Sequence, residues 1–402
     1  MPAINCIEDL RLLAHKRVPR MFYDYVDSGS WSECTYHANE RDLARICFRQ
    51  RVAVNVENRS LRATMIGEDV AMPVALAPIG LCGMLHADGE LLAARAAEAF
   101  GVPFCLSTMS IASIEDVAAN TLKPFWFQLY VMRNRGFVER LISRAKAAQC
   151  SALVVTLDLP LAARRHGLGR GLSAPPKLTL ASLAGMAMRP RWCLEMLGTR
   201  RRTFGNLAGH VEGAHDMTSL LAWIEQQFDP RLSWRDIAWI RGLWDKKLVL
   251  KGIMDAEDAR RAVDAGADAI VVSNHGGRQL DGAPSSIHVL PMIAKAAGDD
   301  MEVWFDGGIR SGQDVLRAMA SGARGTMIGR AFLYGLAAMG ERGVHLCLEI
   351  LAKDLSLTMG LCGLVDINAA DSSVLMDGAS ALHMPVTLMP LSHQPESNLP
   401  KD

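Results

Sequence analysis

Short apolar runs, many of them rich in β-branched residues, recur along the chain from residue 73 onward. Each run stops at glycine or at a polar residue, which is typical of a buried strand. Eight runs predict strands, at residues 73–78, 102–107, 125–130, 152–157, 247–251, 269–273, 302–305 and 325–328. Alanine-rich segments with a helical period lie between most of them, at 90–100, 114–119, 137–148, 256–265 and 313–321. This alternation predicts an α/β fold, a single (β/α)8 TIM barrel with parallel strands inside and helices outside.

The segment before the first predicted strand has a different pattern. Apolar spacing over residues 7–28 predicts two short helices that separate near Pro19. We therefore divide the chain into an N-terminal helical cap and lead-in at 1–72, a barrel at 73–365 and a C-terminal tail at 366–402. The helical pattern fades after Lys353, and the proline-rich end of the tail, 384–402, is expected to be disordered.

A long insertion interrupts the alternation of strands and helices. Residues 158–246 separate the fourth and fifth predicted strands, which is too many residues for a simple loop. A helix at 233–244, with Ser233 as its N-cap, accounts for the last part. The remainder, 163–230, is expected to cover the face of the barrel where the strands end, because barrel enzymes carry their lids there.

The insertion is strongly basic, although the chain as a whole is not. Residues 164–202 contain nine basic residues against the single acidic residue Glu195, with Met, Leu and Trp192 interleaved. Such a segment either lies on an anionic membrane surface without spanning it or forms a solvated, mobile loop. Over the whole chain 43 basic residues balance 43 acidic ones, which argues against a nucleic-acid-binding protein.

Cysteine usage and the N-terminus indicate the compartment. The nine cysteines are scattered, without Cys-x-x-Cys or His/Cys spacing, so they predict buried thiols in a reducing compartment and no metal site. Residues 1–20 carry charges throughout, which does not fit a signal peptide, and the longest apolar run, 70–85, is too short and too rich in proline to cross a bilayer. We therefore expect a cytoplasmic protein.

The stretch 269–281 carries the clearest chemical signal. An apolar run turns polar at Ser273 and places His275 and Arg278 around Gly276 and Gly277. His exchanges protons near neutral pH, and Arg offers a planar fork to a carboxylate. A base beside an anion clamp predicts an acidic substrate, whereas a half-buried structural His is the alternative interpretation.

The other predicted strand ends add a dense polar set at the same face of the barrel. Gly307, Gly308 and Arg310 after the seventh strand, with Gly329 and Arg330 after the eighth, offer backbone N–H groups and guanidiniums and predict a phosphate cradle. The remaining strand ends deliver Pro78, Ile79, Gly80, Ser107, Gln128, Tyr130, Thr156, Asp158, Lys251 and Asp306.

Two of these residues have an open role on residue type alone. Lys251 either stabilises charge on an electron-accepting ring, forms a Schiff base as in an aldolase, or makes a salt bridge at the edge of the core. Asp158 on the fourth strand is expected to meet His275 across the barrel mouth and to orient its imidazole.

Four motifs together resemble the family of FMN-dependent α-hydroxy acid dehydrogenases and oxidases. They are Ser-Asn-His-Gly-Gly-Arg-Gln-Leu-Asp at 273–281, Phe-Gln-Leu-Tyr at 127–130, Asp-Gly-Gly-Ile-Arg at 306–310 and Ile-Gly-Arg at 328–330. The resemblance runs from about residue 7 to 365. Segments 72–84, 39–43 and 228–234 are similar to the bacterial quinone-linked L-lactate dehydrogenases, with the mandelate dehydrogenases next.

The resemblance implies a role for each matching residue. His275 would take a proton from the substrate, Asp158 would pair with His275, and Tyr130 would hydrogen-bond the substrate hydroxyl. Arg165 and Arg278, assisted by Tyr25, would hold the substrate carboxylate. Lys251 would stabilise negative charge on the reduced flavin. FMN would be held by Pro78, Ile79, Gly80, Ser107, Gln128, Thr156, Ser273, Asp306, Gly307, Gly308, Ile309, Arg310, Gly329 and Arg330.

The resemblance also implies an activity and its partners. We expect FMN-dependent oxidation of an L-2-hydroxy acid, most of all L-lactate, to the 2-oxo acid, with electrons passed to a quinone. The alternatives are an oxidase that uses O2, a mandelate-type dehydrogenase, a flavin-free lyase using Lys251, and a non-catalytic phosphate-binding barrel. We further expect a homotetramer that lies on the inner face of the cell membrane through residues 163–230.

The chain departs from the family pattern at two places. Relatives usually carry an acidic residue shortly after the position of Arg165, whereas this chain has a glycine-rich run there, so either Arg164 or Arg165 is the lid arginine. Ser28 and Ser30 stand where Gly and Ala are common, a change that we expect to be tolerated.

Overall fold

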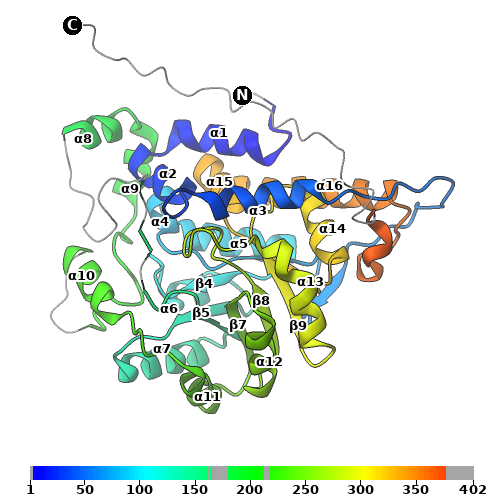
Figure 1. Cartoon of the computed structure of the whole chain (residues 1–402). Helices are drawn as coiled ribbons and strands as arrows, with labels where there is room; N and C mark the ends of the chain where they lie inside the picture. The colour runs from blue at the N-terminus through cyan, green and yellow to red at the C-terminus, as the bar shows by residue number, and fades with distance from the viewer. Residues whose placement is uncertain (1–2, 162, 165, 167–179, 212–216, 377–402) are drawn as a thin grey trace, which may run out of the picture.

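Eight parallel strands form a closed barrel at the centre of the molecule (Figure 1). The structure is a computed structural model that describes residues 3–161, 163–164, 166, 180–211 and 217–376. The strands follow the order β3-β10-β9-β8-β7-β6-β5-β4, and a parallel bridge between Leu76 and Phe104 joins the two ends. They are β3 (Val74–Leu76), β4 (Cys105–Ser107), β5 (Trp126–Tyr130), β6 (Ala152–Thr156), β7 (Lys247–Ile253), β8 (Ala269–Val272), β9 (Glu302–Asp306) and β10 (Gly325–Ile328).

These strands confirm the predicted barrel and seven of its eight strands to within about two residues at each end. Every residue of β6, β8 and β10 is buried, because helices cover the outside and side chains fill the inside. The exception is the second strand, predicted at 102–107, because β4 begins three residues later, at Cys105, after Pro103.

The outer helices begin where the sequence offers caps. The Ser113, Asn134 and Ser311 side chains each accept the N–H of the residue three positions on, and Asp255 accepts the N–H of Glu257, two positions on. The helices are α5 (Gly89–Phe100), α6 (Ile114–Ala118), α7 (Arg135–Ala147), α11 (Trp234–Leu243), α12 (Ala256–Asp264), α13 (Ser286–Ala297), α14 (Gly312–Ala320), α15 (Arg330–Met339) and α16 (Glu341–Leu361), with the short α4 (Cys82–Leu85) before α5.

The N-terminal cap contains the two predicted helices and two further elements. Pro19 separates α1 (Ile7–Arg17) from α2 (Arg20–Asp27), as expected, and α3 (Cys34–Arg45) follows. A hairpin of β1 (Ala63–Met65) and β2 (Glu68–Val70) turns at Ile66 and Gly67, which both have positive φ. Because the Trp126 indole donates to Glu68 and the N–H of Ile66 donates to Glu302, this hairpin lies at the end of the barrel where strands begin.

The prediction that helical structure fades after Lys353 was wrong. Helix α16 continues to Leu361, because Leu355 and Met359 are fully buried against its neighbours α14 and α15. Beyond it, η2 (Ile367–Ala369) and η3 (Ser372–Val374) lead to Met376, whose N–H donates to the Cys47 carbonyl at 2.9 Å. The segment expected to be disordered, 384–402, lies outside the described residues.

The insertion forms helices at one side of the barrel, α8 (Leu180–Ala187), α9 (Pro190–Gly198) and α10 (Met217–Gln227) (Figure 1). Between α9 and α10, Phe204 and Leu207 are buried, and the Asn206 amide donates to Ser110 at 3.0 Å. This part therefore packs on the barrel rather than projecting from it. None of the helices in the described part of the chain combines the length and the apolar character that a membrane-spanning helix requires.

Candidate active site

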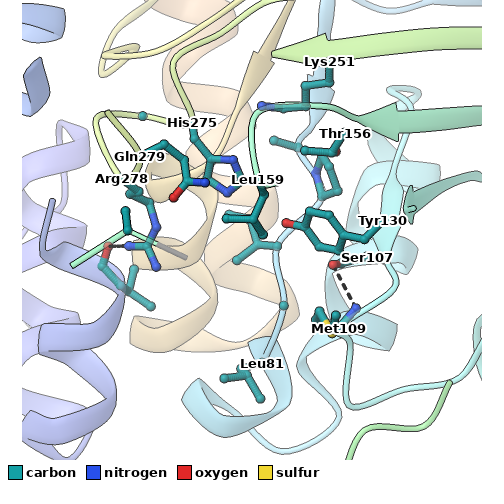
Figure 2. Close-up of a pocket in the computed structure, with 18 of the residues that line it drawn as sticks. Leu81, Ser107, Met109, Tyr130, Thr156, Leu159, Lys251, His275, Arg278 and Gln279 are labelled. Atoms are coloured by element: carbon teal, nitrogen blue, oxygen red, sulfur yellow. Dashed lines mark hydrogen bonds between the residues drawn. The ribbon is translucent and has the colours of Figure 1, made fainter. Parts of the chain in front are cut away.

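The strand ends surround a cavity of about 620 Å³. This volume is in the range of small-molecule and cofactor sites. Tyr25 from the cap and Phe204 and Ile224 from the insertion line it together with the strand-end residues. Figure 2 shows that Tyr130 of β5, Lys251 of β7, and His275 and Arg278 of the loop after β8 all lie around this one space.

His275 and Asp158 form the pair that was expected at the barrel mouth. His275 Nδ1 lies 2.9 Å from Asp158 Oδ1. Burial raises the pKa of the Asp158 carboxyl, but the charge and hydrogen bond of His275 outweigh burial, so its pKa lies below its ordinary value. An ionised Asp158 accepts only, so neutral His275 donates from Nδ1 and keeps the Nε2 lone pair for a substrate proton.

The backbone around His275 has an unusual conformation. His275, Gly276 and Gly277 have φ of 58°, 64° and 70°, a left-handed run that suits glycine but not histidine. Ser273 Oγ accepts the His275 N–H at 3.1 Å, and Ser30 donates to the Gly277 carbonyl from its N–H at 2.9 Å and its Oγ at 3.1 Å. The cap therefore holds this loop through Ser30.

Arg278 forms hydrogen bonds to the C-terminal end of helix α2. Its Nη1 donates to the carbonyls of Tyr25, Val26 and Ser28 at 2.9, 3.1 and 3.1 Å. Its guanidinium also lies over the Tyr25 ring, 5.0 Å from the centroid. The last carbonyls of a helix have no partner within the helix, so Arg278 caps α2 and fixes Tyr25 at the cavity wall.

Lys251 belongs to a buried ionic cluster. Its Nζ lies 2.6 Å from Asp306 Oδ2 and 2.7 Å from Ser273 Oγ, and Ser273 Oγ donates to Asp306 at 3.0 Å. Burial lowers the pKa of Lys251, but the charges of Asp306 and Asp158 outweigh burial and raise its pKa above the ordinary value. The cluster therefore favours the charged form of Lys251, whereas a Schiff-base lysine must react as a neutral amine.

Lys251 reaches this position through an irregularity in β7. The register of β7 against β8 shifts between Lys251 and Ile253, where Gly252 has a φ of 105°. A Cβ at Gly252 would lie 2.8 Å from Asp158 Cβ, so the glycine lets β7 pass close to the carboxylate.

A row of polar side chains beside Lys251 suits a flat heterocycle. Gln128 Oε1 accepts from Ser107 Oγ at 3.1 Å and from the Thr108 N–H at 3.2 Å. The amide orientation is thereby fixed, and Gln128 Nε2 and Thr156 Oγ1 are buried without a hydrogen-bond partner among the described residues. Buried donors of this kind are normally satisfied by a ligand, and a flavin ring carries the matching acceptors.

The predicted phosphate cradle forms at the other end of the cavity. Gly307 and Gly308 have φ of 129° and 84° and pack against Asn39 so tightly that a Cβ on Gly308 would lie 2.5 Å from the Asn39 carbonyl oxygen. Gly329 is the N-cap of α15, and Gly329, Arg330 and Leu333 line the cavity, so α15 begins at its wall. These features fit the phosphate of FMN.

Both arginines of the cradle are engaged with protein groups. Arg310 Nη2 pairs with Glu40 at 2.8 Å. The three side-chain nitrogens of Arg330 donate to the carbonyls of Val26, Gly276 and Ser28 at 3.0, 2.8 and 3.0 Å. In this arrangement Arg330 holds the His275 loop against the cap. Backbone N–H groups, rather than the Arg330 guanidinium, would therefore be the phosphate donors on this side of the cradle.

Most of the predicted site residues meet in or directly behind the cavity. Asp158, Gln128 and Ser273 lie behind its wall, and Arg165 lies outside the described residues, whereas Arg164 lines the cavity. The other predicted residues that line it are Tyr25, Pro78, Ile79, Gly80, Ser107, Tyr130, Thr156, Lys251, His275, Arg278, Asp306, Gly307, Gly308, Ile309, Arg310, Gly329 and Arg330.

Sequence reasoning missed two supporting residues. Asn39 of α3 exchanges two amide hydrogen bonds with Asn274, at 2.9 and 2.8 Å, and thereby joins the His275 loop to the phosphate loop. Gln279 donates from Nε2 to the Asp158 carbonyl at 2.6 Å and fixes the start of the insertion. Both stand within motifs that carried the family resemblance, but only their spatial position shows what they hold.

Comparison with known proteins places the chain in a family. A sequence profile described as FMN-dependent dehydrogenase matches residues 14–377. The L-lactate dehydrogenase of Caulobacter vibrioides (strain NA1000 / CB15N) is 44% identical over 376 residues, 93% of this chain and 98% of the relative. The L-lactate dehydrogenase of Pseudomonas syringae pv. syringae (strain B728a) is also 44% identical over the same shares of the two chains.

Solved structures with the same fold come from enzymes named for mandelate. One is described as the monotopic membrane protein (S)-mandelate dehydrogenase and has a TM-score of 0.88 and 35% identity over 93% of this chain and 99% of that one. A mandelate oxidase with (S)-2-phenylpropionate has a TM-score of 0.76 and 35% identity over 92% and 97%. With the family profile matching nearly the whole chain, and buried donors and glycine turns that fit a flavin and its phosphate, this chain is a member of the FMN-dependent dehydrogenase family, an oxidoreductase whose cofactor is FMN.

Proposed function

We propose that this enzyme oxidises an L-2-hydroxy acid, chiefly L-lactate, to the 2-oxo acid and passes the electrons to a membrane quinone. The observation that carries the reaction class is the His275–Asp158 pair, at 2.9 Å, beside Arg278 in the cavity. The two relatives named L-lactate dehydrogenase, each 44% identical, support lactate as the substrate.

His275 is proposed as the catalytic base. Oxidation of a 2-hydroxy acid removes the hydroxyl proton and the α-hydrogen. His275 Nε2 would take the hydroxyl proton if the α-hydrogen leaves as hydride, or the α-proton if a substrate carbanion forms first. In both cases the ionised Asp158 stabilises the imidazolium that results. FMN, when bound, accepts the two electrons of the oxidation.

The substrate carboxylate is proposed to bind at the cap side of the cavity. Arg278 and Tyr25 are held together there, and Arg165 or its neighbour Arg164 would supply the second guanidinium. Tyr130, at the end of β5, would hydrogen-bond the substrate hydroxyl. This arrangement would present the hydroxyl-bearing carbon to His275 while the side chain of the acid faces Leu159 and Met109.

Lys251 is proposed to stabilise negative charge on the reduced cofactor. Its raised pKa supports this role, because a cation at this position needs no proton transfer during turnover. The same property weighs against the flavin-free lyase. Gln128, Thr156, Ser107 and Ser273 would bind or border the ring, Pro78, Ile79 and Gly80 would line its face, and Asp306, Gly307, Gly308, Ile309, Arg310, Gly329 and Arg330 would surround the phosphate.

The electron acceptor and the location are proposed from the insertion. The apolar helices α8 and α9, with Arg189 and Arg191 at the start of α9, and the relative described as a monotopic membrane protein support peripheral attachment to the inner face of the cell membrane. A quinone would then be within reach of the cofactor. A homotetramer remains the assembly that the family resemblance favours.

Anaerobic addition of a panel of L-2-hydroxy acids to the purified holoenzyme tests the substrate class. We expect L-lactate to bleach the visible flavin spectrum faster than L-mandelate, D-lactate or glycolate, followed by reoxidation with a soluble quinone. Faster bleaching by L-mandelate would instead identify a mandelate-type dehydrogenase. Release of one peroxide per lactate in air would identify an oxidase.

A further inference from the structure

A second, basic cavity lies between helices α1 and α9, away from the active site. It encloses about 160 Å³, roughly ten times the volume that a single water molecule needs. Lys16 and Arg17, from the last turn of α1, and Arg189 and Arg191, at the start of α9, bring four cations to its lining. Figure 1 shows the two helices next to each other at the top of the molecule, on the side of the insertion.

The charges of this cavity are poorly balanced by the protein itself. Glu195 is the one carboxylate in its lining, and it already pairs with Arg191 at 2.9 Å and lies 3.5 Å from His86 Nε2. Arg17 donates to the Ala338 carbonyl, and burial followed by the charge of Arg191 lowers its pKa. Arg189 Nε is buried without a hydrogen-bond partner in the described part of the chain. An anion in the cavity would reduce the repulsion between the cations and would give Arg189 Nε a hydrogen-bond acceptor.

The two elements that form the cavity also carry exposed apolar side chains. Met188, Leu194 and Leu197 of the α8–α9 hairpin are 68%, 70% and 71% exposed. Leu12, one helical turn before Lys16 on α1, is 53% exposed. Exposed large aliphatic side chains on the same helices as a cation cluster are typical of a surface that meets the headgroup layer of a bilayer.

The start of helix α9 is anchored to the rest of the protein through Trp192. Trp192 is buried, donates from Nε1 to the Met84 carbonyl at 3.0 Å and stacks on Phe22 of α2 with ring centroids 5.4 Å apart. This anchor positions the start of α9, so that Arg191 lines the same cavity as Lys16 and Arg17. A preformed cluster of this kind loses little side-chain entropy on binding.

We propose that the cavity between α1 and α9 is a binding site for the phosphate headgroup of an anionic phospholipid. Lys16, Arg17, Arg189 and Arg191 would contact the phosphate while Met188, Leu194 and Leu197 enter the acyl boundary. The proposal rests on the proposed membrane attachment, not on the oxidation, and it adds α1, which lies outside the insertion, to the attachment surface.

The test compares two variants that remove the same charge. Lys16→Gln removes a cation of the cavity, and Arg200→Gln removes an exposed cation of the insertion outside it; neither side chain has an ion pair among the described residues. Flotation of the holoenzyme with vesicles of phosphatidylcholine alone, and with added phosphatidylglycerol, measures membrane binding. We expect Lys16→Gln to weaken binding to the phosphatidylglycerol vesicles about fivefold, the effect of one cation at an anionic surface, and Arg200→Gln to weaken it clearly less.

Three outcomes would overturn the site. An equal loss of vesicle binding in Lys16→Gln and Arg200→Gln would show that the basic charges act only through a diffuse electrostatic field. Equal binding of the wild type to vesicles with and without phosphatidylglycerol would show an apolar contact only. Thermal stabilisation by inorganic phosphate that Lys16→Gln abolishes, without a selective loss of vesicle binding, would assign the cavity to free phosphate. Lactate-dependent reduction of a soluble dye is measured in all variants, so a failure of the proposed oxidation is seen separately.

Discussion

At the scale of single residues, the site depends on contacts that hold an unfavourable backbone. A left-handed backbone conformation costs a non-glycine residue about 1–2 kcal/mol. His275, in the loop after β8, has this conformation. The pairing of His275 with Asp158 could be predicted, because both follow strands that end at one face. The supports from Ser30, Asn39 and Arg330 could not, since no periodicity tells which distant carbonyl a polar side chain reaches.

Ser30 gives the residue-scale prediction. Ser30→Ala removes the Oγ–H bond to the Gly277 carbonyl and leaves the backbone N–H bond in place. A hydrogen bond of this kind contributes about 1 kcal/mol, so we expect kcat to fall up to about fivefold, with FMN content and KM little changed. Steady-state kinetics with a soluble dye measures this.

The matched control is Ser28→Ala on the same segment. The Ser28 hydroxyl is buried without a hydrogen-bond partner in the described ranges, so its loss should leave kcat near the wild-type value. If the two variants behave alike, or if Ser30→Ala raises KM instead of lowering kcat, the serine does not position the His275 loop.

At the scale of elements, the barrel strands were predictable and several supporting elements were not. Continuous apolar runs mark buried parallel strands, and both N-terminal helices were found from Pro19 and their spacing. The β1–β2 hairpin was missed because three-residue strands carry too little pattern. The end of α16 was missed because Ser356, Thr358 and Gly360 are weak helix formers, and tertiary packing decides their conformation.

Helix α2 gives the element-scale prediction, because Asp27 ties it to its neighbours. Asp27 accepts from Arg11 of α1 at 3.1 and 2.8 Å and from the Tyr334 hydroxyl of α15 at 2.5 Å. Burial opposes ionisation of Asp27, but the bonds from Arg11 and Tyr334 outweigh it and lower its pKa. We expect Asp27→Asn to lower Tm at pH 7 and to raise KM for lactate, because Tyr25 is on the same helix.

The pH dependence of this effect has a definite sign. A lowered pKa stabilises the fold above the ordinary carboxyl value of 3.8, and this stabilisation is lost as the pH falls through the lower folded value. The gap in Tm between wild type and Asp27→Asn should therefore narrow below about pH 4. Asp24→Asn, on the same helix with the exposed partner Arg20, is the control and should change neither Tm nor KM appreciably. A gap that widens in acid would contradict the account.

At the scale of the whole molecule, the two ends of the barrel differ: one end is covered by the β1–β2 hairpin, and the other forms the candidate site. The hairpin packs at the end where strands begin, and the cap, the insertion and the strand ends meet at the other, around one cavity. Sequence analysis predicted the site and the insertion at the strand ends from the barrel alone, but it did not predict the hairpin at the other end. It did not show that residues 199–211 pack on the barrel, or that Arg201 pairs with Asp88 and Asp116 and so turns part of the basic charge inward.

The central claim is that His275 removes the substrate proton in a flavin enzyme. The most direct measurement is the visible spectrum of purified wild type and His275→Ala, both loaded with FMN, during anaerobic titration with L-lactate. The account predicts equal flavin absorbance in the two proteins at the start, full bleaching of wild type, and a bleaching rate at least about 10²-fold lower in His275→Ala. Bleaching of His275→Ala at the wild-type rate would contradict it.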